Sequence, residues 1–97
     1  IYIAAVGTKA IFHSHNLAYT LRKEFPDLGI QLNCNGGSFK AQLKRADKAN
    51  AEISLLIGDE ELDANSISIK HLQNDKPQKK VLAQDLKKEI KSIFTNK

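Results

Sequence analysis

The sequence predicts a three-layer α/β/α sandwich built on a five-stranded sheet. Short β-branched, apolar segments alternate with longer segments whose apolar residues recur at helical spacing, in the order β-α-β-α-β-β-β-α. Two βαβ units require parallel strands with helices on the faces of the sheet, and a polar loop between the last two strands adds an antiparallel hairpin. No repeat or linker divides the 97 residues, so we expect one compact domain.

The first third of the chain contains a strand, a helix and a second strand. The segment 1–6, IYIAAV, is apolar and β-branched, which is typical of a buried strand. A helix is predicted from about residue 10 to 25, and Pro26 and Gly29 end it. The segment 29–34, GIQLNC, predicts the second strand. The apolar positions that we expect on the inner face of the helix are Ile11, Leu17, Ala18, Leu21 and Phe25.

The middle of the chain predicts a helix followed by a central strand. Ser38 is a favourable N-cap for a helix that turns Phe39, Leu43 and Ala46 inward. The segment 53–58, ISLLIG, is almost continuously apolar, as expected of a strand covered on both faces. The residues that we expect in the core are Phe39, Leu43, Ile53, Leu55 and Ile57.

The last third begins with an acidic segment, 59–63, which predicts a turn or a single helical turn. The alternating segment 66–72, the polar loop 73–78 and the segment 79–83 together predict the hairpin. A final amphipathic helix starts at about Gln84. Its expected buried residues are Leu86, Ile90 and either Ile93 or Phe94.

The charge of the chain is concentrated in its first half. The net charge is +4, and residues 1–50 carry seven basic and three acidic side chains, whereas residues 51–97 carry eight of each. An anionic partner that faces the first half would explain this excess, and a solvated basic surface explains it equally well.

The composition also bears on the cellular context. No apolar segment approaches the length of a membrane span, and no signal-peptide pattern opens the chain. The single cysteine, Cys34, has no partner for an internal disulfide, which favours a reducing cytoplasm. The first residue is isoleucine rather than methionine, so we expect a domain of a longer protein.

The glycine pair Gly36-Gly37 lies directly before the second helix. A phosphate-binding P-loop requires Lys and then Ser or Thr after its last glycine, and here Ser38, Phe39 and Lys40 follow instead. The spacing therefore favours a tight connection between strand and helix over a nucleotide site.

Neither the histidines nor the cysteine predicts a catalytic or metal site. His13 and His15 are two residues apart near the start of a helix, so their side chains diverge and cannot easily share a metal. Cys34 lacks a second cysteine at metal or redox spacing and has no obvious activating base, so a buried strand residue is expected.

The second helix carries the most informative charge pattern. Lys40, Lys44 and Lys48 recur every four residues on the side opposite the apolar stripe, with Arg45 beside them. Four cations on one exposed side suit a phosphate backbone. A solvated helix face is the alternative, and spacing alone does not decide between the two.

The segment NGGSFKAQLKRADKANAEISLLIGDEE resembles the C-terminal anticodon-binding domain of class II aminoacyl-tRNA synthetases, and the histidyl-tRNA synthetase branch in particular. The strand IYIAAVG, the glycine turn, the strand ISLLIG with its Gly58-Asp59-Glu60-Glu61 turn, SISIKHL and VLAQDL follow in the order of the family. Each piece is short, and their joint order and spacing carry the resemblance over nearly the whole chain.

The resemblance implies a mixed five-stranded sheet with one strand antiparallel to the rest and helices on both sides. It further implies binding of the anticodon stem and loop of histidine tRNA. The parent enzyme, a histidine–tRNA ligase, uses ATP and Mg²⁺ in a separate catalytic domain of the same chain and works as a homodimer. Residues 1–97 are then expected to have no catalytic residue, metal or cofactor of their own, and no DNA or membrane partner.

The resemblance also nominates site residues. In related domains the last acidic residue of the G-x-x-E turn and a basic residue of the following strand contact the anticodon, and these positions are Glu61 and Lys70 here. Lysine lacks the planar fork of arginine, so a phosphate contact suits Lys70 better than base reading. Asn35, in the loop before the second helix, is a further candidate for tRNA binding, and a turn-forming asparagine is its alternative role.

Two other functions remain open at this point. A small doubly wound enzyme that uses Cys34 or a nucleotide is disfavoured by the missing motifs. A synthetase-like domain that has been repurposed as a regulatory or dimerisation module would share the sequence features above.

Overall fold

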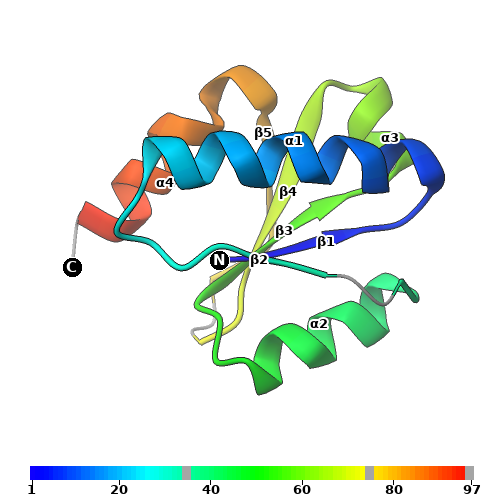
Figure 1. Ribbon diagram of the computed structural model, residues 1–97, viewed down its shortest axis with the longest axis horizontal. Helices are drawn as coiled ribbons and strands as arrows, with labels where there is room; N and C mark the ends of the chain where they lie inside the picture. The colour runs from blue at the N-terminus through cyan, green and yellow to red at the C-terminus, as the bar shows by residue number, and fades with distance from the viewer. Residues whose placement is uncertain (34–35, 74–75, 96–97) are drawn as a thin grey trace.

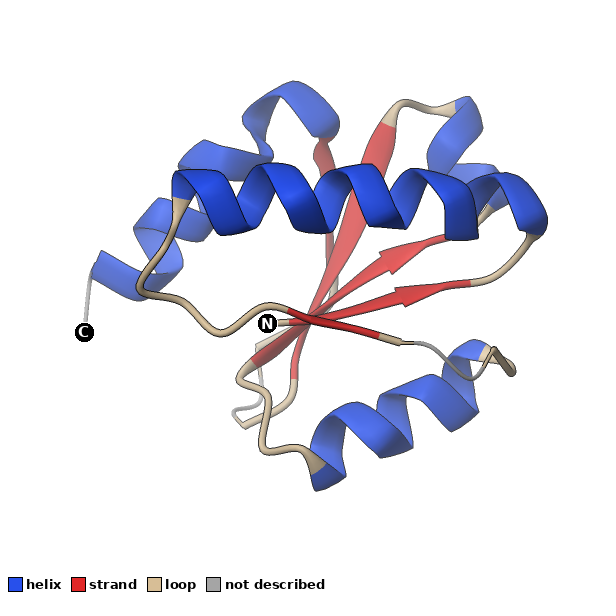
Figure 2. Ribbon diagram, in the orientation of Figure 1, coloured by secondary structure: helices blue, strands red, loops and turns tan. Residues whose placement is uncertain are grey.

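The computed structural model describes residues 1–33, 36–73 and 76–95 and has five strands with helices on both sides (Figures 1 and 2). The prediction for Cys34 as a buried strand residue and that for Asn35 lie outside the described residues. The elements, in chain order, are β1 (Tyr2–Ala5), α1 (Thr8–Glu24), β2 (Gln31–Leu32), α2 (Phe39–Lys48), β3 (Ile53–Ile57), α3 (Asp59–Asp63), β4 (Ser66–His71), β5 (Lys79–Leu82), a 3₁₀ turn (Ala83–Asp85) and α4 (Leu86–Thr95).

The sheet has the strand order β2-β1-β3-β4-β5. Strand β1 pairs in parallel with β2 and β3, whereas β4 pairs antiparallel with both β3 and β5. Strand β4 therefore runs opposite to the other four, which confirms the mixed sheet with one antiparallel strand. Helices α1 and α4 cover one face and α2 covers the other (Figure 1), so the three-layer arrangement is confirmed as well.

The main hydrophobic core lies between the sheet and the layer of α1 and α4. Strand β3 is buried along its whole length because it lies at the centre of the sheet between β1 and β4. Ile53, Leu55 and Ile57 belong to this core as predicted, whereas Phe39 and Leu43 on the other face are only half-buried. In the described parts of the chain, no helix has the length and apolar character needed to cross a membrane.

The predicted inner face of helix α1 is confirmed except at Ile11: Ala18 and Leu21 are buried, and Leu17 and Phe25 pack against the core. The buried residues of the helix are Ala10, Ser14, Ala18 and Leu21, and Ile11 is 42% exposed, so the prediction for Ile11 was wrong. Three of the four buried residues have small side chains, and they recur at helical spacing. The hydroxyl of Ser14 donates a hydrogen bond to the carbonyl oxygen of Ile11 at 2.6 Å, which makes its burial tolerable.

The layer beneath α2 is smaller and depends on one polar side chain. Among the described residues, a second apolar cluster consists of the buried Tyr2, Ala46 and Ala51, with Leu72 packed against it. On the same helix, the side chain of Gln42 is fully buried. The sequence pattern, which counted only apolar residues, missed this position.

Candidate nucleic-acid interface

A shallow groove between α2 and β4 collects the basic residues that the sequence singled out. Lys40 and Lys44 line it from the helix, and Lys70 lines it from the strand. Residues 40 and 44 lie one turn apart on α2, so both side chains reach the same flank of the helix. Three cations from two elements therefore face one concave surface, and Asp47 supplies the acidic side chain of the lining.

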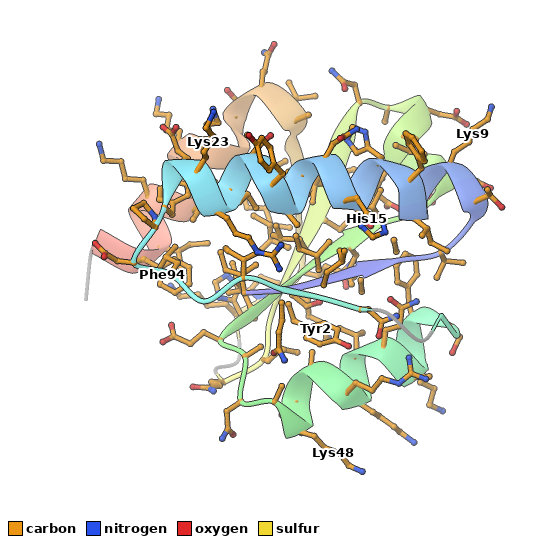
Figure 3. All side chains as sticks on the ribbon, viewed as in Figure 1. Tyr2, Lys9, His15, Lys23, Lys48 and Phe94 are labelled. Atoms are coloured by element: carbon orange, nitrogen blue, oxygen red, sulfur yellow. The ribbon has the colours of Figure 1, made fainter. Side chains whose placement is uncertain are left out.

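Lys48 continues the same helical row but lies beyond this groove. Its side chain is exposed and extends from the C-terminal end of α2 away from the sheet (Figure 3). Cations in the last turn also interact favourably with the helix dipole, and this stabilising role requires no ligand.

Arg45 is not part of the exposed row, so its placement beside the three lysines was wrong. Its Nη1 donates hydrogen bonds to the carbonyl oxygen of Gly36 at 2.6 Å and to Oδ1 of Asn33 at 3.1 Å. The side chain is half-buried against the glycine turn. The reason is geometric, because position 45 lies on the flank of α2 that faces the end of β2 rather than on the flank that faces β4.

The glycine turn, Gly36-Gly37, is stabilised by its own backbone conformation and by hydrogen bonds from neighbouring side chains. Gly36 and Gly37 have φ angles of 62° and 98°, a region that side chains disfavour, so both glycines are needed for this path. The phenol of Tyr2 donates to Oδ1 of Asn33 at 2.7 Å, and Nδ2 of Asn33 donates to the carbonyl oxygen of Gly36 at 3.2 Å. Together with Arg45, these contacts fix the entry to α2. The glycine turn is thus a tight connection between β2 and α2, as the spacing predicted.

Gln42 joins this turn to the centre of the sheet. Its Oε1 accepts a hydrogen bond from the amide of Ala5 at 2.9 Å, and its Nε2 donates to the carbonyl oxygens of Ala5 at 2.8 Å and Gly37 at 2.7 Å. Within the described residues, strand β2 pairs with Tyr2 and Ile3 of β1. The carboxamide therefore takes the place of a neighbouring strand at Ala5.

The carboxylate of Glu61 has partners on both oxygens. Oε1 accepts from the amide of Gly58 at 2.9 Å, which is the carboxylate half of a capping box at the start of α3. Oε2 accepts from the hydroxyl of Ser68 at 3.3 Å, and Nζ of Lys80 lies 4.0 Å from it. Only 12% of the side chain is exposed. Helix α3 thus uses Glu61 as its own N-terminal acid, and its predicted contact with tRNA stays a prediction.

Glu61 and Lys70 nonetheless lie on the same side of the sheet. Ser68 contacts Glu61, and because side chains alternate along a strand, Ser68 and Lys70 share one face of β4. That face is the one on which α2 packs. The two predicted anticodon residues therefore border one surface, with the groove of Lys40 and Lys44 beside them.

Lys80 is a basic residue of this surface that the sequence analysis missed. It lies on β5 opposite Ser68 of β4, is partly exposed, and its Nζ is 3.5 Å from Oε1 of Glu60. An exposed pair of this kind contributes little to stability. The register between β4 and β5 places Lys80 opposite Ser68, whose hydroxyl contacts Glu61, and the sequence pattern does not reveal this register.

The histidines do not form a metal site with other residues of the described chain. No group of three His, Cys, Asp or Glu side chains in residues 1–33, 36–73 and 76–95 has a suitable arrangement. His13 and His15 are both exposed on α1. His71 lies at the end of β4, where burial lowers its pKa, the charge of Lys76 lowers it further, and Glu89 opposes the change.

Comparison with known proteins identifies a family with which this chain shares its sequence pattern and fold. A family model described as an anticodon binding domain matches residues 1–93. Among solved structures, histidyl-tRNA synthetase from Nostoc sp. PCC 7120 is 25% identical with a TM-score of 0.83, over 97% of this chain and 22% of that one. The apo histidyl-tRNA synthetase of S. aureus is 24% identical with a TM-score of 0.79, over 91% of this chain and 25% of that one.

A threonyl-tRNA synthetase structure has the same fold at lower identity. The RNA binding domain structure from Cryptosporidium parvum Iowa II is 11% identical with a TM-score of 0.82, over 94% of this chain and 22% of that one. The chain spans about a quarter of the length of each of these synthetase chains. The fold is therefore shared by synthetases for different amino acids.

Proposed function

The chain belongs to the anticodon-binding domain family, since the family model matches residues 1–93, and we propose that it binds the anticodon stem and loop of histidine tRNA. In this proposal it serves as a domain of a histidine–tRNA ligase. Histidine is preferred over threonine because the identity to histidyl-tRNA synthetases is 24–25%, against 11% to the threonyl enzyme.

The observation that carries the proposal is the meeting of Lys40, Lys44 and Lys70 on one groove. Phosphates dominate the affinity of proteins for nucleic acids, and these three lysines can each neutralise a phosphate charge there. Bases of a single-stranded loop expose their pairing edges, so residues that border the groove are positioned to read them. Glu61 is the proposed base reader and Lys70 a proposed phosphate contact, and Lys48, Lys80 and Asn35 are proposed as further contacts.

The activity of the parent protein is part of the same proposal. Residues 1–97 would recognise the tRNA, while a catalytic domain elsewhere in the synthetase chain binds ATP and Mg²⁺ and attaches histidine. We propose a cytoplasmic homodimer for that enzyme, with the present domain in each subunit.

The test measures tRNA binding at several salt concentrations. Replacing Lys40, Lys44 or Lys70 by alanine should weaken binding to all tRNAs alike and reduce the slope of log K against log salt by about one for each lost phosphate contact. The matched control is Lys88→Ala, an exposed lysine on α4 on the other side of the sheet. An unchanged slope in all three groove variants would show that these lysines are only solvated surface residues and would refute the proposed site.

A further inference from the structure

Phe39 is an aromatic side chain that neither hydrophobic cluster of the domain includes. The sequence pattern predicts it in the core, whereas its side chain is only half-buried. In the described part of the chain, Phe39 belongs neither to the two clusters of buried apolar residues nor to the partly buried residues packed against them. Two other half-buried phenylalanines, Phe25 and Phe94, do pack against the main core. Core packing therefore does not account for Phe39.

The ring of Phe39 lies against the backbone of Gly58, at the start of α3. The Cβ atom of an alanine at position 58 would lie 3.0 Å from Oε1 of Glu61 and 3.3 Å from Cε2 of the Phe39 ring. Both distances are shorter than an ordinary van der Waals contact, so a side chain at this position would displace the ring or the carboxylate. Gly58 thus lets an aromatic ring and a carboxylate approach the same point of the backbone.

On α2, Phe39 lies directly beside the lysine groove. Lys40 follows it in the chain, Leu43 lies one helical turn further along, and both of these residues line the groove. On its other side the ring shares its contact with Gly58 with the carboxylate of Glu61. Phe39 is therefore placed between the proposed phosphate contacts and the proposed base reader.

This order of groups matches the chemistry of a nucleotide in a single-stranded loop. Its phosphate requires a cation, the edge of its base requires a donor or acceptor, and the face of its base requires a flat apolar surface. Unpaired bases of RNA stack on aromatic side chains for this reason. The lysines and Glu61 offer no such surface, and the half-exposed ring of Phe39 does.

We propose that Phe39 binds tRNA by stacking its ring on one base of the anticodon loop. This inference rests on the proposed function and adds to it the residue that holds the face of a base. Stacking tolerates any base, because every base has a flat π face, so Phe39 contributes affinity while neighbouring polar groups supply the choice of base.

The first experiment measures binding of tRNA to the full synthetase. Phe39→Leu keeps an apolar side chain but removes the ring, and it should weaken binding about tenfold, as expected for one lost base stack. The slope of log K against log salt should be unchanged, because stacking releases no counterions. Phe39→Tyr keeps the ring and should bind normally. The matched control is Phe94→Leu, at a half-buried phenylalanine of α4 on the other face of the sheet (Figure 1).

The second experiment separates stacking from a change in the packing of α2. The loop nucleotides of a histidine tRNA transcript are made abasic one at a time, and each transcript is bound to the wild type and to Phe39→Leu. The variant should lose about tenfold on every transcript except the one that lacks the stacked base, where the two proteins should bind equally. A displaced α2 would weaken binding to all transcripts alike.

Three outcomes would overturn the inference: normal binding by Phe39→Leu, equal losses for Phe39→Leu and Phe39→Tyr, or an equal loss for Phe39→Leu on every abasic transcript. The groove variants test the proposed function separately. If they lower the salt slope while Phe39→Leu binds normally, tRNA binding stands and stacking does not. Absence of tRNA binding by the wild type would overturn both.

Discussion

At the level of single residues, several side chains that look like binding groups in the sequence have structural partners. Arg45 holds the glycine turn, and Glu61 caps α3 while it also accepts from Ser68. Lys40 and Lys44 remain exposed. A charged residue contributes to binding only with the donors or acceptors that the fold leaves available, so the exposed lysines are the stronger candidates for tRNA contacts.

Two substitutions separate the structural role of Glu61 from its predicted role in recognition. Glu61→Ala removes the acceptor for the amide of Gly58 and should lower the free energy of unfolding by about 1 kcal/mol. Glu61→Gln keeps a side-chain oxygen for that amide and should retain most of the stability. Thermal or urea unfolding of the two variants checks this difference.

Charging assays then test whether the carboxylate of Glu61 reads a base. If it does, both variants should raise the activation free energy for charging of histidine tRNA by about 1–3 kcal/mol. Charging of a transcript with an altered anticodon should be unchanged. Lys70→Ala should instead weaken charging of both transcripts by similar factors, as expected for a phosphate contact. Equal losses on the two transcripts for Glu61→Gln would leave Glu61 with its structural role alone.

His71 predicts a pH dependence of stability. Its pKa is lowered in the folded state, chiefly by burial, so the unfolded chain binds the proton more readily. The contribution of His71 is therefore fully present above the ordinary pKa of histidine and is lost as the pH falls through the lower folded value. Urea unfolding between pH 7 and pH 5 should show a smaller loss of stability in His71→Gln than in the wild type. His15→Gln, at an exposed position on α1, is the control, and equal pH profiles for the His71 variant and the wild type would contradict this assignment.

At the level of elements, the connection from β2 to α2 depends on polar groups rather than on apolar packing. Strand β2 has only two residues, and beyond it the backbone of β1 is satisfied by the carboxamide of Gln42. The hydrogen bonds among Tyr2, Asn33, Arg45 and the glycine turn stabilise the same connection. These contacts set where α2 begins and hence where its lysines lie.

Gln42→Leu should therefore be strongly destabilising although the two side chains have similar sizes. The substitution leaves the amide and the carbonyl oxygen of Ala5 buried without partners, at a cost of ~2–5 kcal/mol for the two groups. Denaturant unfolding measures this loss, with Gln31→Leu as the control because Gln31 is exposed. Equal stability of the Gln42 variant and the wild type would show that the hydrogen bonds to Ala5 contribute nothing.

At the level of the whole molecule, one main core joins the sheet to α1 and α4, while the opposite face carries α2 and the basic groove. The protein thus separates a strongly packed layer from a thinner, polar layer that faces the proposed ligand. Recognition residues on the thinner layer can change without loss of the main core.

A single core predicts a single unfolding transition. Leu55 is fully buried at the centre of β3, and Leu55→Ala should lower the stability of the whole chain by ~2–5 kcal/mol, as large-to-small core changes do. Circular dichroism and tyrosine fluorescence should report the same midpoint in the wild type and in the variant. Leu82→Ala, at an exposed position on β5, should have a much smaller effect. Separate midpoints for the two probes would contradict the expectation of one domain.

The sequence by itself determined the order of the elements, the mixed sheet and the buried central strand. These features follow from local periodicity and from the handedness of βαβ units, which act over a few residues, and from a family resemblance that spans the chain. It also singled out Lys40 and Lys44, because lysines at helical spacing opposite an apolar stripe can be recognised without coordinates, and the family resemblance singled out Lys70.

Only the tertiary structure decided which of these residues face the same groove and which are already bonded. The partners of Arg45, Gln42 and Glu61 are distant in sequence or lie on another element, so no local pattern contains them. Ile11 illustrates the same limit, since only the packing of α1 on the sheet decided that Ala10 and Ser14 are buried while Ile11 is exposed. Local patterns fix what each element is, whereas packing between elements fixes which of its side chains remain free to bind.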